Sequence, residues 1–363
     1  MIRCDNGSNP VIRGFDFSLH GGVGIYDASC RNLAIEMNKF VVGPNCTIAI
    51  NQSAAASAII IRGNFIDGGG YVSACATDPV GENILLGGSG SKVVEYNWIR
   101  NAAQHFLTLS GSGNTARVRY NLAERCGFFQ GNHCNGIQFV GGSWAAPIIS
   151  HNTFISDQPD VHGDLHGSQL ANFEAGSNTA VTGSAYGLVT LEHTYAASLA
   201  SGMSIASPNL PSGTTIASVS NSGGPCCAGP GTHPVITTLV LSQKAVKTGR
   251  ASFDIPNAYP SGLVNPIQID AQLHALIRNA QIDDNVVVAA PGPVTTVSYA
   301  ISIDSDDSSL NVGASVMNNY VDARGAYGAF YPADCLHAPH CHGATFLGNV
   351  DMTTGAAIRP LRR

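Results

Sequence analysis

The chain has 363 residues, of which 44% are hydrophobic and only 12% are charged, so it can bury a large core and is not a disordered protein. Its formal net charge of −6 leaves no basic patch for nucleic acid. No run of about 18 apolar residues is present, so no membrane span is expected. The 41 glycines and the four lysines are typical of strands and tight turns rather than of helices.

One short motif recurs along the chain: an apolar residue, two variable residues, Asn, and then one or more apolar residues. Neighbouring motifs recur at nearly regular intervals, with one much longer gap between Asn152 and Asn285. Such intervals are the coil lengths of a parallel β-helix, in which short strands of successive coils stack about 4.8 Å apart. We expect each Asn to take the left-handed conformation and to bond its neighbours above and below, with the flanking apolar residues, Trp98 among them, inside. The repeated asparagines are Asn38, Asn64, Asn97, Asn121, Asn152, Asn285, Asn319 and Asn349.

A second strand is predicted ahead of each Asn. Ile267-Gln-Ile269 and Ile301-Ser-Ile303 alternate apolar and polar residues, which is the pattern of a strand with one face in water. Glycine pairs such as Gly87-Gly88 supply the turns. The predicted fold is therefore all-β: a right-handed parallel β-helix of roughly ten coils.

The long gap between Asn152 and Asn285 contains a segment of different composition. Residues 176–253 are rich in Ser, Thr, Ala and Gly, and we interpret them as a β-rich insertion. Removing them leaves about 53 residues, enough for two coils. The β-helix is thus expected to consist of 1–175 and 254–363. The insertion is expected to serve packing, oligomerisation or carbohydrate contact.

The ten cysteines give a mixed expectation. Cys335 and Cys341 flank a short His-rich loop and can form a disulfide in an oxidising compartment. Cys226 and Cys227 are adjacent and cannot form a relaxed disulfide with each other. Six others are scattered among apolar residues and are expected to be buried thiols.

Polar residues recur at one position of the predicted coils. Counting back by one fixed interval from four of the repeated asparagines reaches Gln104, Asn135, Gln268 and Ser302. These side chains are expected on one sheet face, where neighbours in adjacent coils lie about 5 Å apart.

The spacing of the next coil predicts the neighbours of this face. Gln138 and Gln169 are separated by the same interval as Asn121 and Asn152. A polar column with about 5 Å between partners should result if that register holds. The expected pairs are Asn135 with His166, His133 with Asp164, and Gln138 with Gln169.

A family resemblance accompanies these residues. His133-Cys-Asn135-Gly-Ile-Gln138 resembles the His-x-Asp-Gly-Ile-Gln pattern of many β-helix polysaccharide-acting proteins, with Asn135 in place of the acid. The repeat as a whole resembles the pectate-lyase-like superfamily, which includes polysaccharide lyases and phage tailspikes. The insertion resembles small β modules of phage tails and bacterial surface proteins. The paired-Asp, Gly-His-Gly and Arg-x-Lys signatures of β-helix pectinases are reduced to an isolated Asp306-Asp307, so the resemblance is to the fold.

The candidate chemistry lies between residues 133 and 169. His162, Asp164 and His166 alternate, so an extended strand would direct all three to one side. Such a triplet suits an acid–base group on a sugar, a metal ion, or exposed loop polars. In a lyase, His133 or His166 is the base, held by Asp164.

The remaining polar groups have expected roles as well. Asn135, Gln138 and Gln169 are candidates to bind a substrate carboxylate or hydroxyls, together with Gln104, His162 and Gln268. A hydrolase instead needs two carboxyl groups, for which Asp160 with Asp164, or Asp304 with Asp306, are the options. Neither route requires a cofactor, and a divalent metal is the alternative. Aromatic rings such as Trp144 are candidates to stack on sugars.

Taken together, the leading expectation is an extracellular or virion-surface enzyme that depolymerises a polysaccharide, as a lyase or a glycoside hydrolase. The alternative is a non-catalytic β-helix that binds glycan or serves as a fibre. The expected partner is polysaccharide rather than nucleic acid or membrane. A virion-borne form is expected to be a homotrimer.

Overall fold

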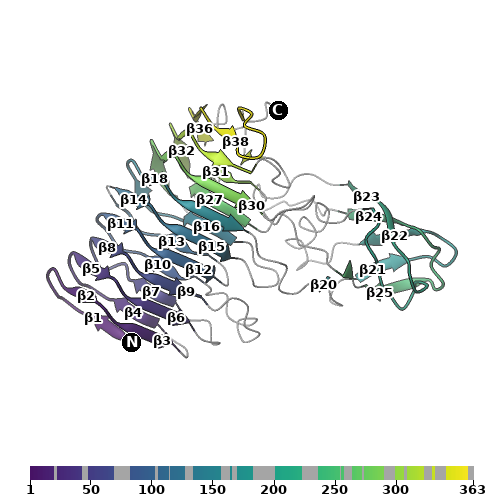
Figure 1. Ribbon diagram of the computed structural model, residues 1–363, viewed down its shortest axis with the longest axis horizontal. Coiled ribbons are helices and arrows are strands. Elements are labelled where there is room, and N and C mark those ends of the chain that lie inside the picture. The colour runs from purple at the N-terminus through teal and green to yellow at the C-terminus, as the bar shows by residue number, and fades with distance from the viewer. Residues whose placement is uncertain are drawn as a thin grey trace. The chain divides into compact units, whose positions relative to one another are not determined.

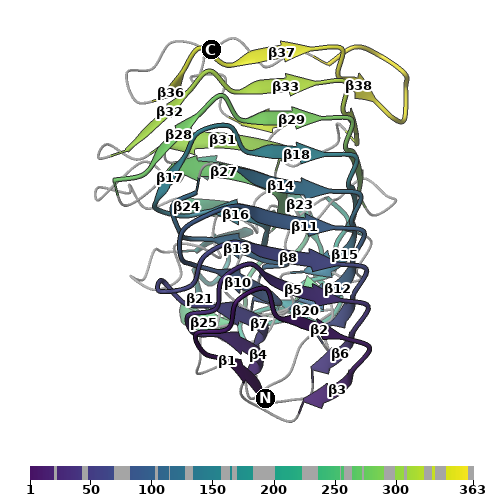
Figure 2. The same cartoon turned by 90° about the vertical axis from the view of Figure 1, so that its left-hand side faces the viewer.

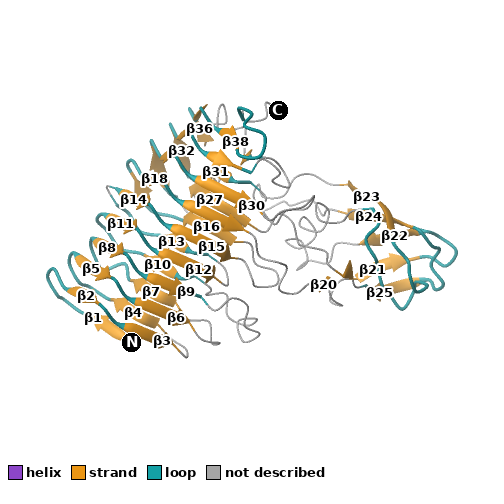
Figure 3. Cartoon of the chain, in the orientation of Figure 1, coloured by secondary structure: helices purple, strands orange, loops and turns teal. Residues whose placement is uncertain are grey.

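A computed structural model describes most of the chain. It covers residues 1–19, 23–42, 48–68, 82–102, 105–113, 115–126, 134–156, 164–165, 170–182, 201–222, 236–253, 255–256, 264–271, 274–289, 299–305, 309–322, 329–331 and 341–358. Within these ranges every regular element is a β-strand (Figure 3). No helix in the described part of the chain is long and apolar enough to cross a membrane.

Three parallel sheets form the body of the protein, and each coil contributes one strand to each sheet (Figures 1 and 2). Sheet S1 is built from β1 (Ile2–Cys4), β4 (Val23–Asp27), β7 (Ile48–Gln52), β10 (Ile84–Leu86), β13 (Leu107–Leu109), β16 (Cys134–Phe139), β27 (Val264–Ala271), β31 (Ile301–Ser305) and β35 (Phe330–Tyr331). Sheet S2 is built from β2 (Val11–Arg13), β5 (Leu33–Glu36), β8 (Ile59–Arg62), β11 (Lys92–Glu95), β14 (Ala116–Arg119), β18 (Ile148–Ser150), β29 (Gln281–Asp283), β33 (Ser315–Met317) and β37 (Thr345–Leu347). Sheet S3 is built from β3 (Asp16–Leu19), β6 (Lys39–Val42), β9 (Phe65–Asp67), β12 (Trp98–Ala102), β15 (Leu122–Cys126), β19 (Thr153–Ser156), β30 (Val286–Ala289), β34 (Tyr320–Val321) and β38 (Val350–Asp351).

A smaller parallel sheet lies between S1 and S2 in the later coils. It widens the coil from β16 onward, because the chain there makes an extra short strand before it enters S2. Its strands are β17 (Ser143–Trp144), β28 (Leu276–Arg278), β32 (Leu310–Val312) and β36 (Cys341–His342).

The core is made by alternation along each strand. In S1, every second residue of a strand points inward and packs on its counterpart in the next coil, because side chains alternate between the two faces of a strand. A continuous apolar row results, and all of its members are buried. It contains Ile25, Ile50, Ile84, Leu107, Ile137, Ile267, Ile301 and Phe330. The predicted all-β parallel β-helix is confirmed.

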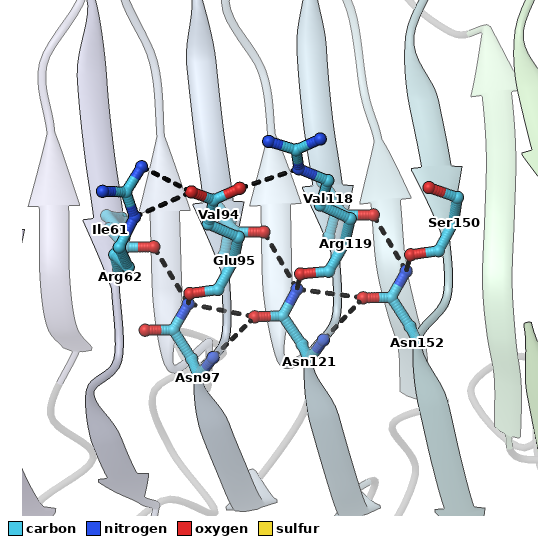
Figure 4. A network of polar contacts seen from close by, with 10 residues as sticks. All are labelled: Ile61, Arg62, Val94, Glu95, Asn97, Val118, Arg119, Asn121, Ser150 and Asn152. Carbon is cyan, nitrogen blue, oxygen red and sulfur yellow. Dashed lines mark hydrogen bonds and ion pairs between the residues drawn. The ribbon is translucent and has the colours of Figure 1, made fainter.

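The repeated asparagines form the predicted ladder. All eight are buried, and from Asn38 to Asn319 each Nδ2 donates to the Oδ1 of the Asn in the next coil, as from Asn97 to Asn121 at 3.0 Å and from Asn121 to Asn152 at 2.9 Å (Figure 4). The same Oδ1 accepts the backbone N–H of the preceding Asn, for example from Asn97 at 3.0 Å. Each Asn thus satisfies buried backbone groups that a turn would otherwise leave unpaired.

The backbone conformation of the turn differs from the expectation. The left-handed residue is the one before each Asn, with φ of 56° at Tyr96, 57° at Tyr120 and 56° at His151. The Asn itself must stay in an ordinary conformation because its side chain turns inward to its neighbours. The exposed residue carries the strain instead, which directs its side chain to solvent.

The long gap between Asn152 and Asn285 corresponds to one coil of the helix, because its strands β19, β27, β28 and β29 supply one strand to each parallel sheet. Asn152 Nδ2 donates to Asn285 Oδ1 at 3.0 Å, and Thr153 in β19 pairs with Val286 in β30. The expectation that the gap holds two coils is therefore wrong, since it holds one. The chain leaves the helix after β19 and re-enters it at β27, one coil further on.

The chain divides into two compact units. The first contains residues 1–157, 264–289 and 297–363, and the second contains 158–263 with 290–296. The segment 176–253, interpreted above as an insertion, lies within the second unit.

The second unit is built from antiparallel strands around its own apolar core, which includes Phe173, Ile216 and Leu239. A five-stranded sheet has the order β23 (Ile216–Ser222), β24 (Ile236–Leu241), β22 (Thr179–Thr182), β21 (Leu170–Phe173) and β25 (Gly249–Ser252). A two-stranded pair joins β20 (Asp164–Leu165) to β26 (Ile255–Pro256).

Disulfides correct part of the expectation for cysteine. Cys4 and Cys30 are bonded to each other, and Cys126 is also disulfide-bonded, so these three are not the buried thiols expected. Cys341 is disulfide-bonded as well. Its expected partner, Cys335, lies outside the described residues.

Candidate functional site

Most of the residues predicted to carry chemistry lie outside the described part of the chain. Asp164 is described, but only by its backbone: it begins β20 and pairs with Pro256 in the second unit, not with a strand of the helix. The predicted residues outside the described ranges are Gln104, His133, Asp160, His162, His166 and Gln169.

The predicted neighbours of Asn135 and Gln138 are wrong. Asn135 pairs with Asn265, and Gln138 pairs with Thr108 on one side and Gln268 on the other. The interval carried over from the asparagines fails here because the chain leaves the helix after β19. Residues beyond that point belong to the second unit rather than to the next coil.

Asn135 sits at an inward position of S1. It is fully buried, and its backbone N–H donates to Nδ1 of His105, itself buried, at 2.8 Å. An inward, fully buried amide offers no surface to a polysaccharide. His105 was not singled out from the sequence, because nothing in its own segment marks it as a neighbour of Asn135.

A polar row runs along the outward-facing positions of S1, and it matches the predicted row only in part. Thr108, Gln138, Gln268 and Ser302 are successive register partners in four coils. The count back from the asparagines found Gln268 and Ser302 correctly but reached Asn135 instead of Gln138. Thr108, Gln138 and Ser302 are 6%, 9% and 3% exposed, so this row offers little free surface.

Exposed rings border the Asn ladder instead. Five of the twelve exposed large apolar side chains of the described residues are directly adjacent to a ladder asparagine, and folded proteins seldom leave such a set in water without a function. Tyr96, Trp98 and Tyr120 are 55%, 42% and 40% exposed. Trp98 was expected in the core, but the inward residue is the second after Asn, Ile99, and Trp98 points outward. We call Phe65, Tyr96, Trp98, Tyr120 and His151 the aromatic stripe.

The left-handed turn positions hold one half of the stripe. The rings of Tyr96 and Tyr120 are parallel within 6° with centroids 5.0 Å apart. Tyr120 in turn contacts the ring of His151 at 4.9 Å. Three consecutive coils therefore present rings in mutual contact, of which Tyr96 and Tyr120 are stacked and His151 is tilted.

The first residues of the S3 strands hold the other half. Phe65 and Trp98 meet edge to face at 5.0 Å, and the guanidinium of Arg100 lies 5.5 Å from both ring centroids. Arg100 Nε is held by Asp67 at 2.9 Å, and the indole N–H of Trp98 bonds Glu124. The ion pair of Arg100 with Asp67 and the hydrogen bond of Trp98 with Glu124 thus hold the rings of Phe65 and Trp98 in place.

A row of alternating charge runs beside the stripe on S2, where Arg13, Glu36, Arg62, Glu95 and Arg119 are successive register partners. Glu95 is the buried centre of this row: its Oε1 accepts Arg62 Nε and its Oε2 accepts Arg119 Nε, both at 2.7 Å (Figure 4).

The pKa of Glu95 lies below its usual value. Burial of the carboxyl group opposes ionisation, but the hydrogen bonds from Arg119 and Arg62 outweigh that cost. Glu95 therefore stays charged and keeps both guanidinium groups in place beside Tyr96 and Tyr120.

Titratable groups lie at the end of the stripe. His151 Nε2 is 3.7 Å from Asp284 Oδ2, and both side chains are close to half exposed. The neighbouring Asp283 has a raised pKa, mainly because it is buried and further because of the charge of Asp284.

Metal-binding potential is limited in the described residues. One group of metal-ligating side chains lies close enough together there, Cys4, Asp27 and Cys30. Its two sulfurs are joined in a disulfide and so are not available as thiolate ligands.

The sequence was also compared with known proteins. A family model described as a right-handed β-helix region matches residues 1–186, just over half of the chain. The chain belongs to this family. The coils described above are accordingly right-handed, as expected for strand–crossover–strand connections. No curated protein matches the sequence.

Proposed function

We propose that this β-helix protein binds an extended polysaccharide along the aromatic stripe. The observation that carries the proposal is the set of solvent-facing rings in mutual contact on consecutive coils, with Tyr96 stacked on Tyr120 and Trp98 edge to face with Phe65. The apolar faces of sugar rings pack on aromatic rings, and coils that repeat about every 4.8 Å present such rings at a regular spacing.

The neighbouring charges supply the polar part of such a site. Arg62 and Arg119 are 47% and 39% exposed in their side chains while Glu95 fixes them from the buried side. Fixed guanidinium groups bind carboxylates and hydroxyls with two hydrogen bonds and little loss of side-chain freedom. An acidic polysaccharide is the ligand class that this combination of rings and cations favours.

The location is proposed on independent grounds. Four cysteines of the described residues are in disulfides, and disulfides persist in oxidising environments. An extracellular or virion-surface protein fits this chemistry. The homotrimer expected for a virion-borne form stays a prediction.

Tryptophan fluorescence provides the test, because the chain has two tryptophans, of which Trp98 is exposed and Trp144 is 1% exposed. Titration with a panel of acidic and neutral polysaccharides should change the emission of the wild type. Trp98→Phe should remove the signal, and Trp144→Phe should keep it.

Affinity should follow the stripe. Tyr120→Ala and Arg119→Ala are expected to weaken binding by about tenfold each, as stacked rings and charged hydrogen bonds contribute about 1–2 kcal/mol. Val246→Ala, which changes an exposed apolar residue of the second unit, is the control and should bind as the wild type. Unchanged binding of the Tyr120 variant would exclude the stripe as the site.

A second candidate is depolymerisation, as lyase or glycoside hydrolase. The base candidate His133, which directly precedes β16 in the chain, favours it. Assays for unsaturated products and for new reducing ends, on the same polysaccharides that change the fluorescence, separate the two chemistries. Loss of either signal in His133→Ala, with binding kept, would support the enzyme. Binding without any product would leave the protein a glycan binder.

A further inference from the structure

Three polar side chains occupy positions of the β-helix core that are apolar in other coils. Asp27 and Gln52 stand in the inward row of S1 that continues as Leu86, and Lys92 stands in the inward row of S2 that contains Ile59. Asp27 and Lys92 are 0% exposed and Gln52 is 2% exposed. A buried lysine is costly unless a specific arrangement holds it, so this cluster calls for a function.

The three side chains form a continuous chain of contacts. Lys92 Nζ lies 2.5 Å from Gln52 Oε1, and it also donates to the carbonyls of Ser57 and Ser89 at 2.9 and 3.1 Å. Gln52 Nε2 donates to Asp27 Oδ2 at 2.9 Å. The amide of Gln52 is therefore held between an amine on its oxygen and a carboxyl on its nitrogen.

This geometry places reacting atoms close together. A nitrogen 2.5 Å from a carbonyl oxygen is at most about 3.7 Å from the carbonyl carbon, because the C=O bond is about 1.2 Å long. That is close to the separation of a near-attack arrangement, and an amine fixed so in a dry core has a very high effective concentration. The leaving nitrogen, Nε2, already contacts a group that can deliver a proton.

We propose that Lys92 and Gln52 join in an intramolecular isopeptide bond, with Asp27 as the acid–base group. The neutral amine of Lys92 attacks Cδ of Gln52 and a new C–N bond forms. Asp27 gives a proton to Nε2 as the old C–N bond breaks, and takes up the proton that the amine releases. Ammonia leaves, and neither oxidant nor reductant is needed.

Burial shifts both titrating groups toward the forms that the reaction uses. Burial lowers the pKa of Lys92 to about 8, against the charge of Asp27, which acts to raise it. Burial also raises the pKa of Asp27, although its hydrogen bond from Gln52 works in the opposite direction. A neutral amine and a protonated carboxyl are therefore easier to reach here than in water.

The bond would tie β7 to β11 in neighbouring coils. It would lie next to the disulfide of Cys4 and Cys30, since the backbone N–H of Cys30 donates to Asp27 Oδ1 at 3.0 Å. The coils that contain β1, β4, β7 and β11 would then carry two covalent links, so their strands could not peel away one by one.

The decisive experiment is a mass measurement on the intact, fully reduced protein. It should be lighter than the sequence mass by one ammonia, and proteolysis should release a branched peptide that joins the segments around Gln52 and Lys92. An unmodified mass in folded protein overturns the proposal. So does loss of ammonia that maps elsewhere, for instance to Asn6-Gly7, where a succinimide forms with the same mass change.

Variants separate the chemistry from the packing. Lys92→Arg keeps the charge but cannot form the amide, and it should show the full mass and a lower melting temperature; Lys39→Arg, an exposed lysine, is the matched control and should keep the link. Asp27→Asn should slow link formation at least tenfold. A linked peptide formed at the wild-type rate in Asp27→Asn would exclude Asp27 as the proton-transfer group, and the wild-type mass decides the matter even if a variant does not fold.

Discussion

The two units of the chain are specified in different ways. In the helix, every coil repeats one turn, and the ladder from Asn38 to Asn349 makes each coil the template for the next. The second unit has no such repeat: its antiparallel strands close around a local core that includes Phe173 and Leu239. A repeat can be read from residue spacing, whereas a local core depends on contacts that spacing does not reveal.

The largest loss of stability is expected when one asparagine of the ladder is removed. Asn121→Ala deletes the bonds from Nδ2 to Val94 O and Asn152 Oδ1, both 2.9 Å, and leaves the buried N–H of Asn97 without its acceptor. Each orphaned buried group costs about 1–3 kcal/mol, so the free energy of unfolding of the helix should fall by about 3 kcal/mol or more. Denaturant titration followed by tryptophan fluorescence reports the helix alone, because Trp98 and Trp144 both lie there.

Asn209→Ala is the matched control in the second unit. Asn209 is also buried, but its Nδ2 makes a long 3.3 Å bond to Gly249 O. The fluorescence transition should stay in place and the total loss should be below about 1 kcal/mol. Equal losses for the two variants would mean that the ladder is no more important than any buried amide.

The charge row of S2 should give a smaller, pH-dependent effect. Glu95→Gln removes the negative charge and turns one of the two oxygens that accept from the partly exposed Arg62 and Arg119 into an amide donor, so we expect a loss of about 1–2 kcal/mol at neutral pH. The pKa of Glu95 is lowered in the folded protein from 4.5. Its stabilisation is therefore present above the unfolded-state pKa and is lost as the pH falls through the folded-state value.

Unfolding curves at several pH values measure this contribution. The wild type and Glu95→Gln should differ most at neutral pH and converge in acid. A difference that stays constant down to the acid transition would show that packing, not charge, is lost in the variant.

Excision of the second unit should have little effect on the helix. Asn152 already contacts Asn285, and β19 already pairs with β30, so residues 158–263 are dispensable for the ladder. A linker of about six residues, close to the 43–47 connection between β6 and β7, should suffice. The circular dichroism spectrum and the midpoint of the fluorescence-detected unfolding curve should remain close to those of the full chain. An unfolded product would show that the helix depends on residues 158–263.

The smallest effect is expected at the left-handed turn residues. At Tyr96, with φ of 56°, Gly should be more stable than Ala by about 1 kcal/mol, because only Gly adopts this conformation without strain. At Arg117, an exposed strand position of β14, the order should be reversed. Two pairs of variants compared by thermal unfolding test both statements, and Ala above Gly at Tyr96 would contradict them.

The sequence predicts the architecture well and the site poorly, and the first reason is the length of the loops. The spacing of Asn97, Asn121 and Asn152 depends on the coil itself, so it survives any detail of the loops. Which residues face each other elsewhere depends on loop lengths, and the count that paired Gln138 with Gln169 fails where the chain leaves the helix.

Orientation was the second difficulty. From the sequence, an apolar residue directly after Asn is expected in the core. Trp98 nevertheless points to solvent, because the first inward-facing position after Asn97 is Ile99. Lys92 is the opposite case: lysine is read as exposed, and only the register that stacks it on Ile59 shows it to be inside.

The central claim is that β19 and β30 pair in register although the chain leaves the helix between them. A designed disulfide tests this register directly. Thr153 and Val286 are partners in adjacent strands, about 4.8 Å apart, whereas Thr153 and Val288 are too far apart for a disulfide. Thr153→Cys with Val286→Cys should oxidise to a new link that peptide mapping places between these positions, and Thr153→Cys with Val288→Cys should not. Equal linking in both variants, or none in the first, would contradict the stacked coils.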